Sequence, residues 1–152
     1  MSAESEKWNN LMKPPVTWTE VLSAVLKDFE CVTGTIHRTD SQTGLLVLAA
    51  HQGIPPFVLD KIQTIPFGKG IAGCAAERRE VVQLCNLQID ATGVAKPAAK
   101  QTNVQGALAI PLINSDHKVV GVLGIGKMQP YEFSDEEISR INIVGNIIQK
   151  SL

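Results

Sequence analysis

Cysteine is scarce in this sequence, and the few cysteines form no pattern that indicates a metal site. Cys31, Cys74 and Cys85 make no C-x-x-C pair, and the three histidines do not lie at a zinc-ligand spacing from them. An odd number of cysteines is typical of free thiols in a reducing compartment. We therefore expect packed cysteine side chains, with neither a bound metal nor a disulfide.

A strong net charge and a long apolar run are also missing. The formal net charge is −1 and there is no basic run, so the electrostatic pattern of nucleic-acid binding is absent. No apolar stretch reaches the roughly 18 residues that span a membrane. The first six residues are polar and acidic, unlike a signal peptide. These absences predict a cytoplasmic protein that binds neither nucleic acid nor membrane.

The composition that remains suits one globular domain. A length of 152 residues falls within the range of about 100 to 200 that is usual for a single domain. Hydrophobic residues make up 44% and charged residues 19%, which argues against disorder. Residues 1–16 are polar and contain a Pro-Pro pair, so we predict an N-terminal arm or short helix there. The domain itself is expected over residues 17–152.

Two segments have the pattern of amphipathic helices that begin with a capping box. Thr17 and Glu20 have the capping-box spacing ahead of the first helix, predicted at 17–29. Ser134 and Glu137 have the same spacing ahead of a second helix that runs to the C-terminus. Each helix has a single apolar stripe. We therefore expect both to pack together on one face of a sheet.

Strand-like runs come in two pairs separated by turn-forming residues. The first pair covers 31–38 and 44–51, and the second covers 107–113 and 119–126. Hairpins that do not alternate with helices predict an antiparallel sheet and the α+β class. Short helices near residue 56 and at 70–79, and a short strand at 80–84, lie between the pairs. Residues 85–105 show no periodicity, which is typical of a functional loop.

The run from Gly68 to Gly73 has the form G-x-G-x-x-G of a dinucleotide-binding turn. Pro66 lies just before it, where a central strand is required, and proline cannot donate to a sheet ladder. About sixty residues precede the motif, although the fingerprint belongs to the first βα turn of its domain. We predict instead that Gly68 and Gly70 form a tight turn that begins a helix. Gly73 then lets that helix lie close to the sheet.

These landmarks, in this order and spacing, resemble a GAF domain from about Thr17 to Leu152. The matching segments are Gly53, residues 66–73, 80–82, 107–112, 120–123 and 133–137. The resemblance implies a central antiparallel sheet of five or six strands with the N- and C-terminal helices packed on one face. It also implies a small-molecule pocket on the other face, covered by short helices and the long loop.

Eight residues are candidates for contact with a ligand in that pocket. The polar candidates lie on the short helix and the loop, and the apolar candidates lie on strands: Cys74, Asp90, Thr92, Gln101 and Asn103, with Ala107, Ala109 and Leu123 as the floor. Strand alternation places Thr33, Thr35 and His37 on one face of the first strand. Either that face or the opposite one meets the pocket.

Some members of the resembled family are free methionine sulfoxide reductases, whose pattern places cysteines near Ile62, Ala72 and Lys100. None of these three positions is cysteine here, and Cys74 lies two residues from the nearest. Thiol redox chemistry needs an activated thiolate and a resolving partner. The sequence shows neither clearly, so we assign no catalytic residue and keep a reductase as an alternative.

Relatives that bind cyclic nucleotides carry an N-K motif followed by a phenylalanine and a D-E pair. Lys127 and Phe133 match this motif, but Gly126 replaces the asparagine and Glu137-Ile138 replaces the acidic pair. An ion pair between Lys127 and Glu137 is compatible with this remnant, although Glu137 also belongs to a capping box. The departures argue against cyclic-nucleotide sensing.

The sequence also argues against a covalently bound chromophore and against haem. Relatives that carry a bilin need adjacent cysteine and histidine, and Cys85-Asn86 lacks the histidine. His37 is the one candidate for a haem ligand, and a solvated strand histidine is the more common interpretation. We therefore expect neither a covalent chromophore nor a metal.

The resulting hypothesis is a stand-alone sensory module that binds a small cytosolic ligand non-covalently and signals to a protein partner. We expect a homodimer through the terminal helices, with Trp8, Leu11 and Met12 extending the interface. The alternative from another class is a dimerisation module with an empty pocket. The identity of the ligand stays open.

Overall fold

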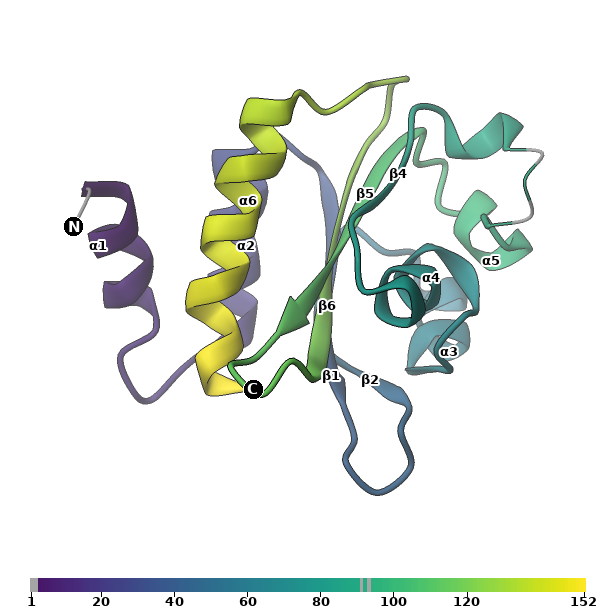
Figure 1. Cartoon of the computed structure of the whole chain (residues 1–152). Helices are drawn as coiled ribbons and strands as arrows, with labels where there is room; N and C mark the ends of the chain where they lie inside the picture. The colour runs from purple at the N-terminus through teal and green to yellow at the C-terminus, as the bar shows by residue number, and fades with distance from the viewer. Residues whose placement is uncertain (1–2, 91, 93) are drawn as a thin grey trace.

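The centre of the molecule is a six-stranded antiparallel sheet with strand order β3-β2-β1-β6-β5-β4 (Figure 1). The computed structural model describes residues 3–90, 92 and 94–152. The strands are β1 (Thr33–Thr39), β2 (Leu46–Gln52), β3 (Thr64–Ile65), β4 (Val82–Leu84), β5 (Gly106–Ile113) and β6 (Val119–Lys127). This confirms the α+β class and both expected hairpins. The short strand β3 is an addition, because two residues before a proline carry no periodic pattern.

Helices cover both faces of the sheet. They are α1 (Ala3–Leu11), α2 (Trp18–Asp28), α3 (Pro56–Ile62), α4 (Gly70–Arg78), α5 (Pro97–Lys100) and α6 (Asp135–Ile148). As predicted, α2 and α6 lie together on one face, and α3, α4 and α5 lie on the other (Figure 1). Among the described residues, no helix is long and apolar enough to cross a membrane.

Only one of the two predicted capping boxes forms. At α6, the Ser134 hydroxyl accepts from the Glu137 amide at 3.1 Å, and the Glu137 carboxylate accepts from the Ser134 amide at 3.0 Å. At α2, Thr17 is the N-cap residue but its side chain makes no capping hydrogen bond. The two N-cap residues differ in ψ, which is 162° at Ser134 and 103° at Thr17. This rotation changes the direction of the Thr17 side chain relative to the first helical turn.

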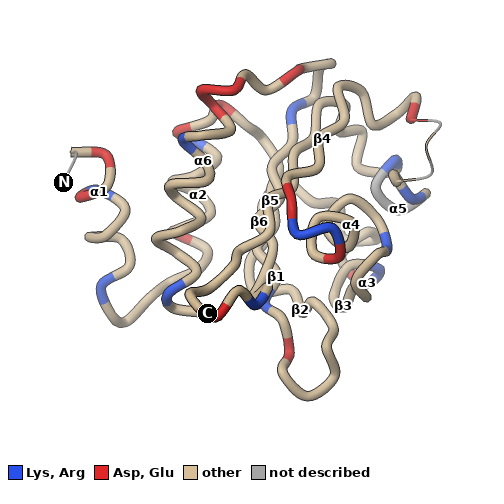
Figure 2. The backbone as a smooth tube through the Cα atoms, in the orientation of Figure 1, with Lys and Arg blue, Asp and Glu red and all other residues tan. Residues whose placement is uncertain are grey.

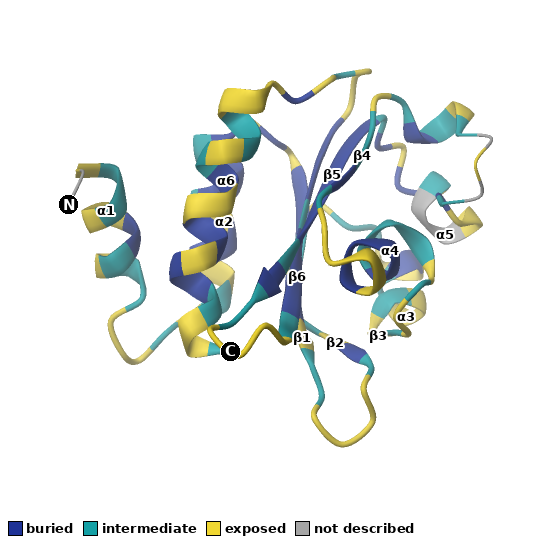
Figure 3. Cartoon of the chain, viewed as in Figure 1, coloured by how far each residue is buried: buried dark blue, intermediate teal, exposed yellow. Residues whose placement is uncertain are grey.

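The main hydrophobic core lies between the sheet and the layer of α2 and α6, and it extends to α1, which packs against α6 on the side that faces away from the sheet (Figure 3). It includes Leu22, Leu26, Ile36 and Leu123, all almost fully buried. Trp8 of α1 is 0% exposed and belongs to this same core. The expectation that Trp8 extends a dimer interface is therefore wrong, because its own chain already buries the whole indole. Residues 1 and 2 of the predicted arm lie outside the described residues.

A second, smaller core joins α4 to the face of the sheet opposite α2 and α6. Its buried members are Leu46, Cys74, Ala75, Ala76, Val82, Ala109 and Val122. Three adjacent small residues of α4, Cys74 to Ala76, let this helix approach the strands closely. A third cluster, Leu87, Ala95, Val104 and Ala107, packs where the segment after β4 meets β5.

Candidate functional site

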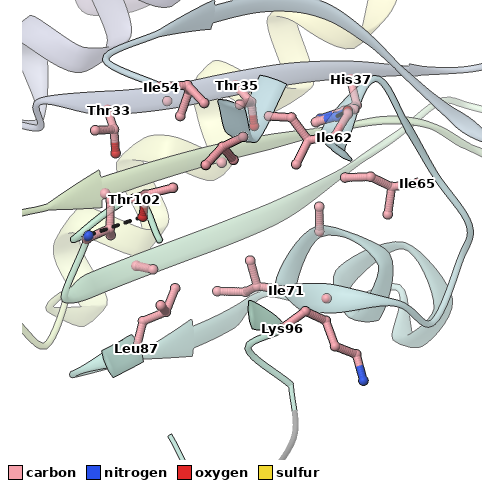
Figure 4. Close-up of a pocket in the computed structure, with 18 of the residues that line it drawn as sticks. Thr33, Thr35, His37, Ile54, Ile62, Ile65, Ile71, Leu87, Lys96 and Thr102 are labelled. Carbon is pink, nitrogen blue, oxygen red and sulfur yellow. Dashed lines mark hydrogen bonds between the residues drawn. The ribbon is translucent and has the colours of Figure 1, made fainter. Parts of the chain in front are cut away.

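A cavity of about 200 Å³ lies on the sheet face opposite α2 and α6 (Figure 4). Strands β1, β5 and β6 form its floor. The segment from α3 to the start of α4, the 3-10 helix at Leu87–Ile89 and residues near Val104 form its walls and roof. Most of the lining is apolar, with Ile54, Ile65 and Ile71 facing inward. The position agrees with the pocket that the sequence resemblance implies.

The floor is hollow because its residues have small side chains or none. Gly124 and Gly126 of β6 and Ala107 of β5 all line the cavity. A Cβ atom on Gly126 would lie 2.7 Å from both the Thr33 hydroxyl and a methyl group of Val104. Any larger residue there would enter occupied space, so glycine keeps the neighbouring side chains in place. Gly126 therefore lets Thr33 and Val104 pack against the strand at the floor of the cavity.

The structure decides which face of β1 meets the cavity. Thr33, Thr35 and His37 line it. On the opposite face, a Cβ atom on Gly34 would lie 2.8 Å from Leu26 and 3.0 Å from Leu22 of α2. Because strand side chains alternate, packing of α2 against Gly34 turns the threonines toward the cavity.

His37 is a neutral wall residue in this cavity. It is 1% exposed, and its Nε2 lies 2.9 Å from the carbonyl oxygen of Ile62. A carbonyl only accepts, so Nε2 carries the hydrogen and joins β1 to α3. Burial lowers the pKa of His37. Its Nδ1 has no hydrogen-bond partner among the described residues.

No metal site accompanies this histidine. Among the described residues, no group of three His, Cys, Asp or Glu side chains is placed to hold a metal ion. The Nε2 atom of His37 is engaged with the Ile62 carbonyl and is not directed at an open ligand position. The geometry therefore assigns His37 to the cavity wall.

The glycine-rich run forms the turn that aims the N-terminus of α4 at the cavity. Gly68 and Gly70 have φ values of 89° and 70°, which other residues rarely adopt. A Cβ atom on Gly73 would lie 2.6 Å from the carbonyl oxygen of Pro66. The close approach at Gly73 is thus to the preceding turn and not to the sheet. Gly70, Ile71 and Ala72 line the cavity.

Three lysines surround the opening of the cavity. Lys61, Lys69 and Lys96 belong to the lining, and all three are exposed. Figure 2 shows basic residues on α3 and α5. The Lys61 ammonium donates to the Gln101 side chain at 3.1 Å, linking α3 to the end of α5. No aspartate or glutamate is among the residues that line the cavity.

The sequence-based candidates are divided among three places. Ala107 lines the cavity. Cys74 and Ala109 lie in the core between α4 and the sheet, where the Cys74 thiol is 3.7 Å from the Gly68 carbonyl oxygen. Leu123 lies in the main core, on the face that packs against α2 and α6.

The polar loop candidates bond mainly to their own segment. Asp90 accepts from the Thr92 amide at 3.1 Å, the Thr92 hydroxyl at 2.6 Å and the Ala95 amide at 2.9 Å. These hydrogen bonds lower the pKa of Asp90 to about 2. Gln101 pairs with Lys61 at the opening, and Asn103 is exposed with φ 64°. None of the polar loop candidates, which are Asp90, Thr92, Gln101 and Asn103, belongs to the lining of the cavity.

Sequence reasoning left open whether Thr33 and Thr35 meet the pocket, and it missed the lysines at the opening. A pattern for the floor was present in the V-L-G-I-G-K segment of β6, where glycines recur at every second position. Such alternation places them on one strand face. The lysines carried no comparable pattern, because three separate segments supply them.

The remnant of the cyclic-nucleotide motif has a structural role. The Lys127 ammonium donates to the carbonyl oxygens of Phe29 and Glu30, both at 3.1 Å, at the end of α2. It also lies 4.3 Å from the centre of the Tyr131 ring. Glu137 instead accepts from the Tyr131 hydroxyl at 2.7 Å. Among the described residues, Lys127 and Glu137 form no ion pair.

An antiparallel sheet that is backed by terminal helices and hollow on its other face defines a class of small α+β domains. The chain belongs to this class by sequence as well: it is a member of the GAF domain family, whose model matches residues 16–150. No protein of curated function matches the chain by sequence.

Solved structures support the same assignment of the fold. The GAF domain from an Acinetobacter phosphoenolpyruvate-protein phosphotransferase has a TM-score of 0.79 at 19% identity, covering 99% of this chain and 93% of that one. The reduced form of fRMsr from Staphylococcus aureus has a TM-score of 0.73 at 23% identity, covering 98% and 92%. Free methionine-R-sulfoxide reductase from Neisseria meningitidis, in complex with its substrate, has a TM-score of 0.78 at 17% identity, covering 96% and 84%. These likenesses show a shared fold.

Proposed function

We propose that this chain is a sensory module that binds a small molecule non-covalently in the cavity and signals to a protein partner. The observation that carries the proposal is the hollow floor made by Gly124, Gly126 and Ala107. An apolar cavity of about 150 Å³ holds benzene. By that scale, a cavity of about 200 Å³ suits a ligand of about eight to ten non-hydrogen atoms.

The apolar lining of the cavity supports a ligand. A ligand that fills the space removes this apolar surface from water, and that burial favours binding. A domain that only dimerises gains nothing from the hollow.

Strand β1 offers a route by which occupancy reaches the outer helices. Thr35 faces the cavity, and the adjacent Ile36 packs in the core beside α2. Because neighbouring residues of one strand move together, a ligand that displaces Thr35 also displaces Ile36. We infer that the signal leaves through the surface formed by the helices on that face.

The proposal is tested by native mass spectrometry of the protein purified from its own cells. Wild type is expected to carry a molecule of constant mass. Ala107→Leu places a larger side chain in the cavity and should remove that mass, whereas the control Ala49→Leu adds the same side chain at an exposed strand position. A bare protein in every preparation of wild type would contradict the proposal and favour a dimerisation module with an empty pocket.

We also propose that two copies associate through the terminal helices. The support is Ile143 of α6, which is 46% exposed although α1 covers much of this helix layer. A shallow groove lined by Asn9, Ile113 and Ile147 lies beside it. Light scattering should show a dimer for wild type and a monomer for Ile143→Glu. The neighbouring exposed position provides the control Asn142→Glu, which should remain dimeric, and a monomeric wild type refutes this proposal.

A thiol-dependent reductase is the alternative activity, favoured by the two reductase structures that share this fold. Ile62 and Ala72, where the family pattern places cysteines, both line the cavity. The three thiols of this chain lie elsewhere: Cys31 and Cys74 are buried outside the lining, and Cys85 is exposed. If Cys74→Ser and Cys85→Ser proteins consume methionine sulfoxide and reductant as fast as wild type, the alternative fails.

A further inference from the structure

We propose that the cavity selects an organic anion: a small carboxylate with a compact apolar body, whose charged group lies at the N-terminus of α4. This inference rests on the proposed ligand-binding function and adds the chemical class of the ligand. Three independent features of the lining carry it: its charges, the bare end of α4 and a buried hydroxyl group.

The charges around the cavity are all of one sign. Lys61, Lys69 and Lys96 line it, and no acidic residue does. Among the described residues, none of these three lysines forms an ion pair, whereas Lys7 and Arg140 elsewhere in the molecule are paired with carboxylates. A cluster of unpaired positive charges beside a low-dielectric cavity attracts an anion and disfavours a cation.

The N-terminus of α4 provides hydrogen-bond donors at the same place. The first amide groups of a helix have no acceptor within the helix. Here the N-cap residue is Lys69, its side chain makes no capping hydrogen bond, and the first turn has no acidic residue. By contrast, α6 has a complete capping box and three acidic residues in its first turn. Ile71 and Ala72 line the cavity, and we assign their amide groups, which have no acceptor within the helix, to a ligand carboxylate.

An unpaired hydroxyl group provides the independent indication of a ligand. Thr33 is 4% exposed and directed into the cavity from the sheet (Figure 4). Among the described residues, its hydroxyl makes no hydrogen bond. The hydroxyl is open to the cavity, so a ligand with polar atoms can bond to it and a pure hydrocarbon cannot.

The arrangement also limits the rest of the ligand. Figure 4 shows Ile54, Ile65 and Ile71 directed into the cavity between the sheet and the roof. These side chains suit an apolar body, and the lysines at the opening suit a charge that stays near solvent. A ligand of about eight to ten non-hydrogen atoms leaves room for one carboxylate and a short branched or aromatic group.

Isothermal titration calorimetry with matched probes tests the inference. The acids are phenylacetate and 4-methylpentanoate, and each is compared with its primary amide, which has the same shape without charge. The test variant is Lys61→Gln/Lys69→Gln/Lys96→Gln, which removes the charge at the opening. The control variant, Lys13→Gln/Lys27→Gln/Lys150→Gln, removes three exposed lysines that do not line the cavity. Circular dichroism checks that both variants fold.

We expect at least one acid to bind wild type about tenfold more tightly than its amide, with an affinity that falls as salt is added. The test variant should lose this preference and the control variant should keep it. Amides that bind as tightly as the acids, absence of acid binding, or an unchanged preference in the test variant would each overturn the inference. The proposed ligand-binding function is judged separately, by the mass of the molecule that wild type carries and its loss in Ala107→Leu.

Discussion

Replacement of Trp8 by alanine tests whether α1 is an integral part of the domain. The indole is 0% exposed and belongs to the same hydrophobic cluster as the buried residues of α2 and α6. Its Nε1 atom has no hydrogen-bond partner among the described residues. The side chain therefore makes two opposing contributions, a favourable one from apolar burial and an unfavourable one from the buried N–H group.

The size of the effect follows from these two contributions. Complete burial of a tryptophan removes about 150–250 Å² from water, worth about 4–6 kcal/mol at about 25 cal/mol per Å². The unpaired N–H group offsets about 1–3 kcal/mol of this. We expect Trp8→Ala to lower the free energy of unfolding by about 3 kcal/mol. Trp8→Phe removes the N–H group and keeps most of the packing, so it should cost about 1 kcal/mol or less.

Urea denaturation followed by far-UV circular dichroism measures both variants against wild type. Circular dichroism is preferred to fluorescence because the substitution removes one of the two tryptophans. A loss below about 1 kcal/mol for Trp8→Ala, with an unchanged m-value, would refute the reasoning. It would mean that α1 is not part of the cooperative unit.

Three further predictions concern single groups. Because burial lowers the pKa of His37, the unfolded state binds one more proton than the folded state below pH about 6.5. The unfolding free energy should therefore fall by up to about 1.4 kcal/mol for each pH unit below that value. His37→Phe should lose this dependence in urea titrations between pH 5 and 8. Asp90→Asn should speed amide hydrogen exchange in its loop. The lowered pKa of Asp90 means that its carboxylate stabilises the folded loop at higher pH. Wild type should therefore show the same faster exchange only as pH falls from 3.8 toward about 2. Ser134→Ala should destabilise the protein by about 1 kcal/mol in urea titrations, and Thr17→Ala by clearly less, since only Ser134 makes a capping hydrogen bond; equal losses would contradict this reading of the two helix ends.

The order of elements was accessible from the sequence because it depends on local patterns. Turn residues between two strand-like runs predicted both hairpins, and the spacing of Ser134 and Glu137 predicted the start of α6. The Thr17 prediction shows the limit of such reasoning. The residue types fit a capping box, but the chain enters α2 with a backbone angle that no sequence spacing reveals.

The residues of the cavity were harder to predict because its lining combines short pieces of many elements. Ala107 was found, since it lies on a strand that the family resemblance already placed. Asp90 and Thr92 have the chemistry of ligand contacts, yet they bond to each other and to the Ala95 amide. A polar loop residue satisfies its nearest backbone groups first, and composition alone does not distinguish that use from ligand binding.

The amino-acid sequence by itself determined the antiparallel sheet, the helices at the N- and C-terminal ends of the domain, and the turn at Gly68 and Gly70. Each of these features depends on periodicity or on backbone freedom within a few residues. Only the tertiary structure decided that Thr33 faces a cavity, that Trp8 is core, and that lysines from three segments meet at one opening. Those outcomes depend on which faces pack against each other, and packing joins residues that are far apart in the chain.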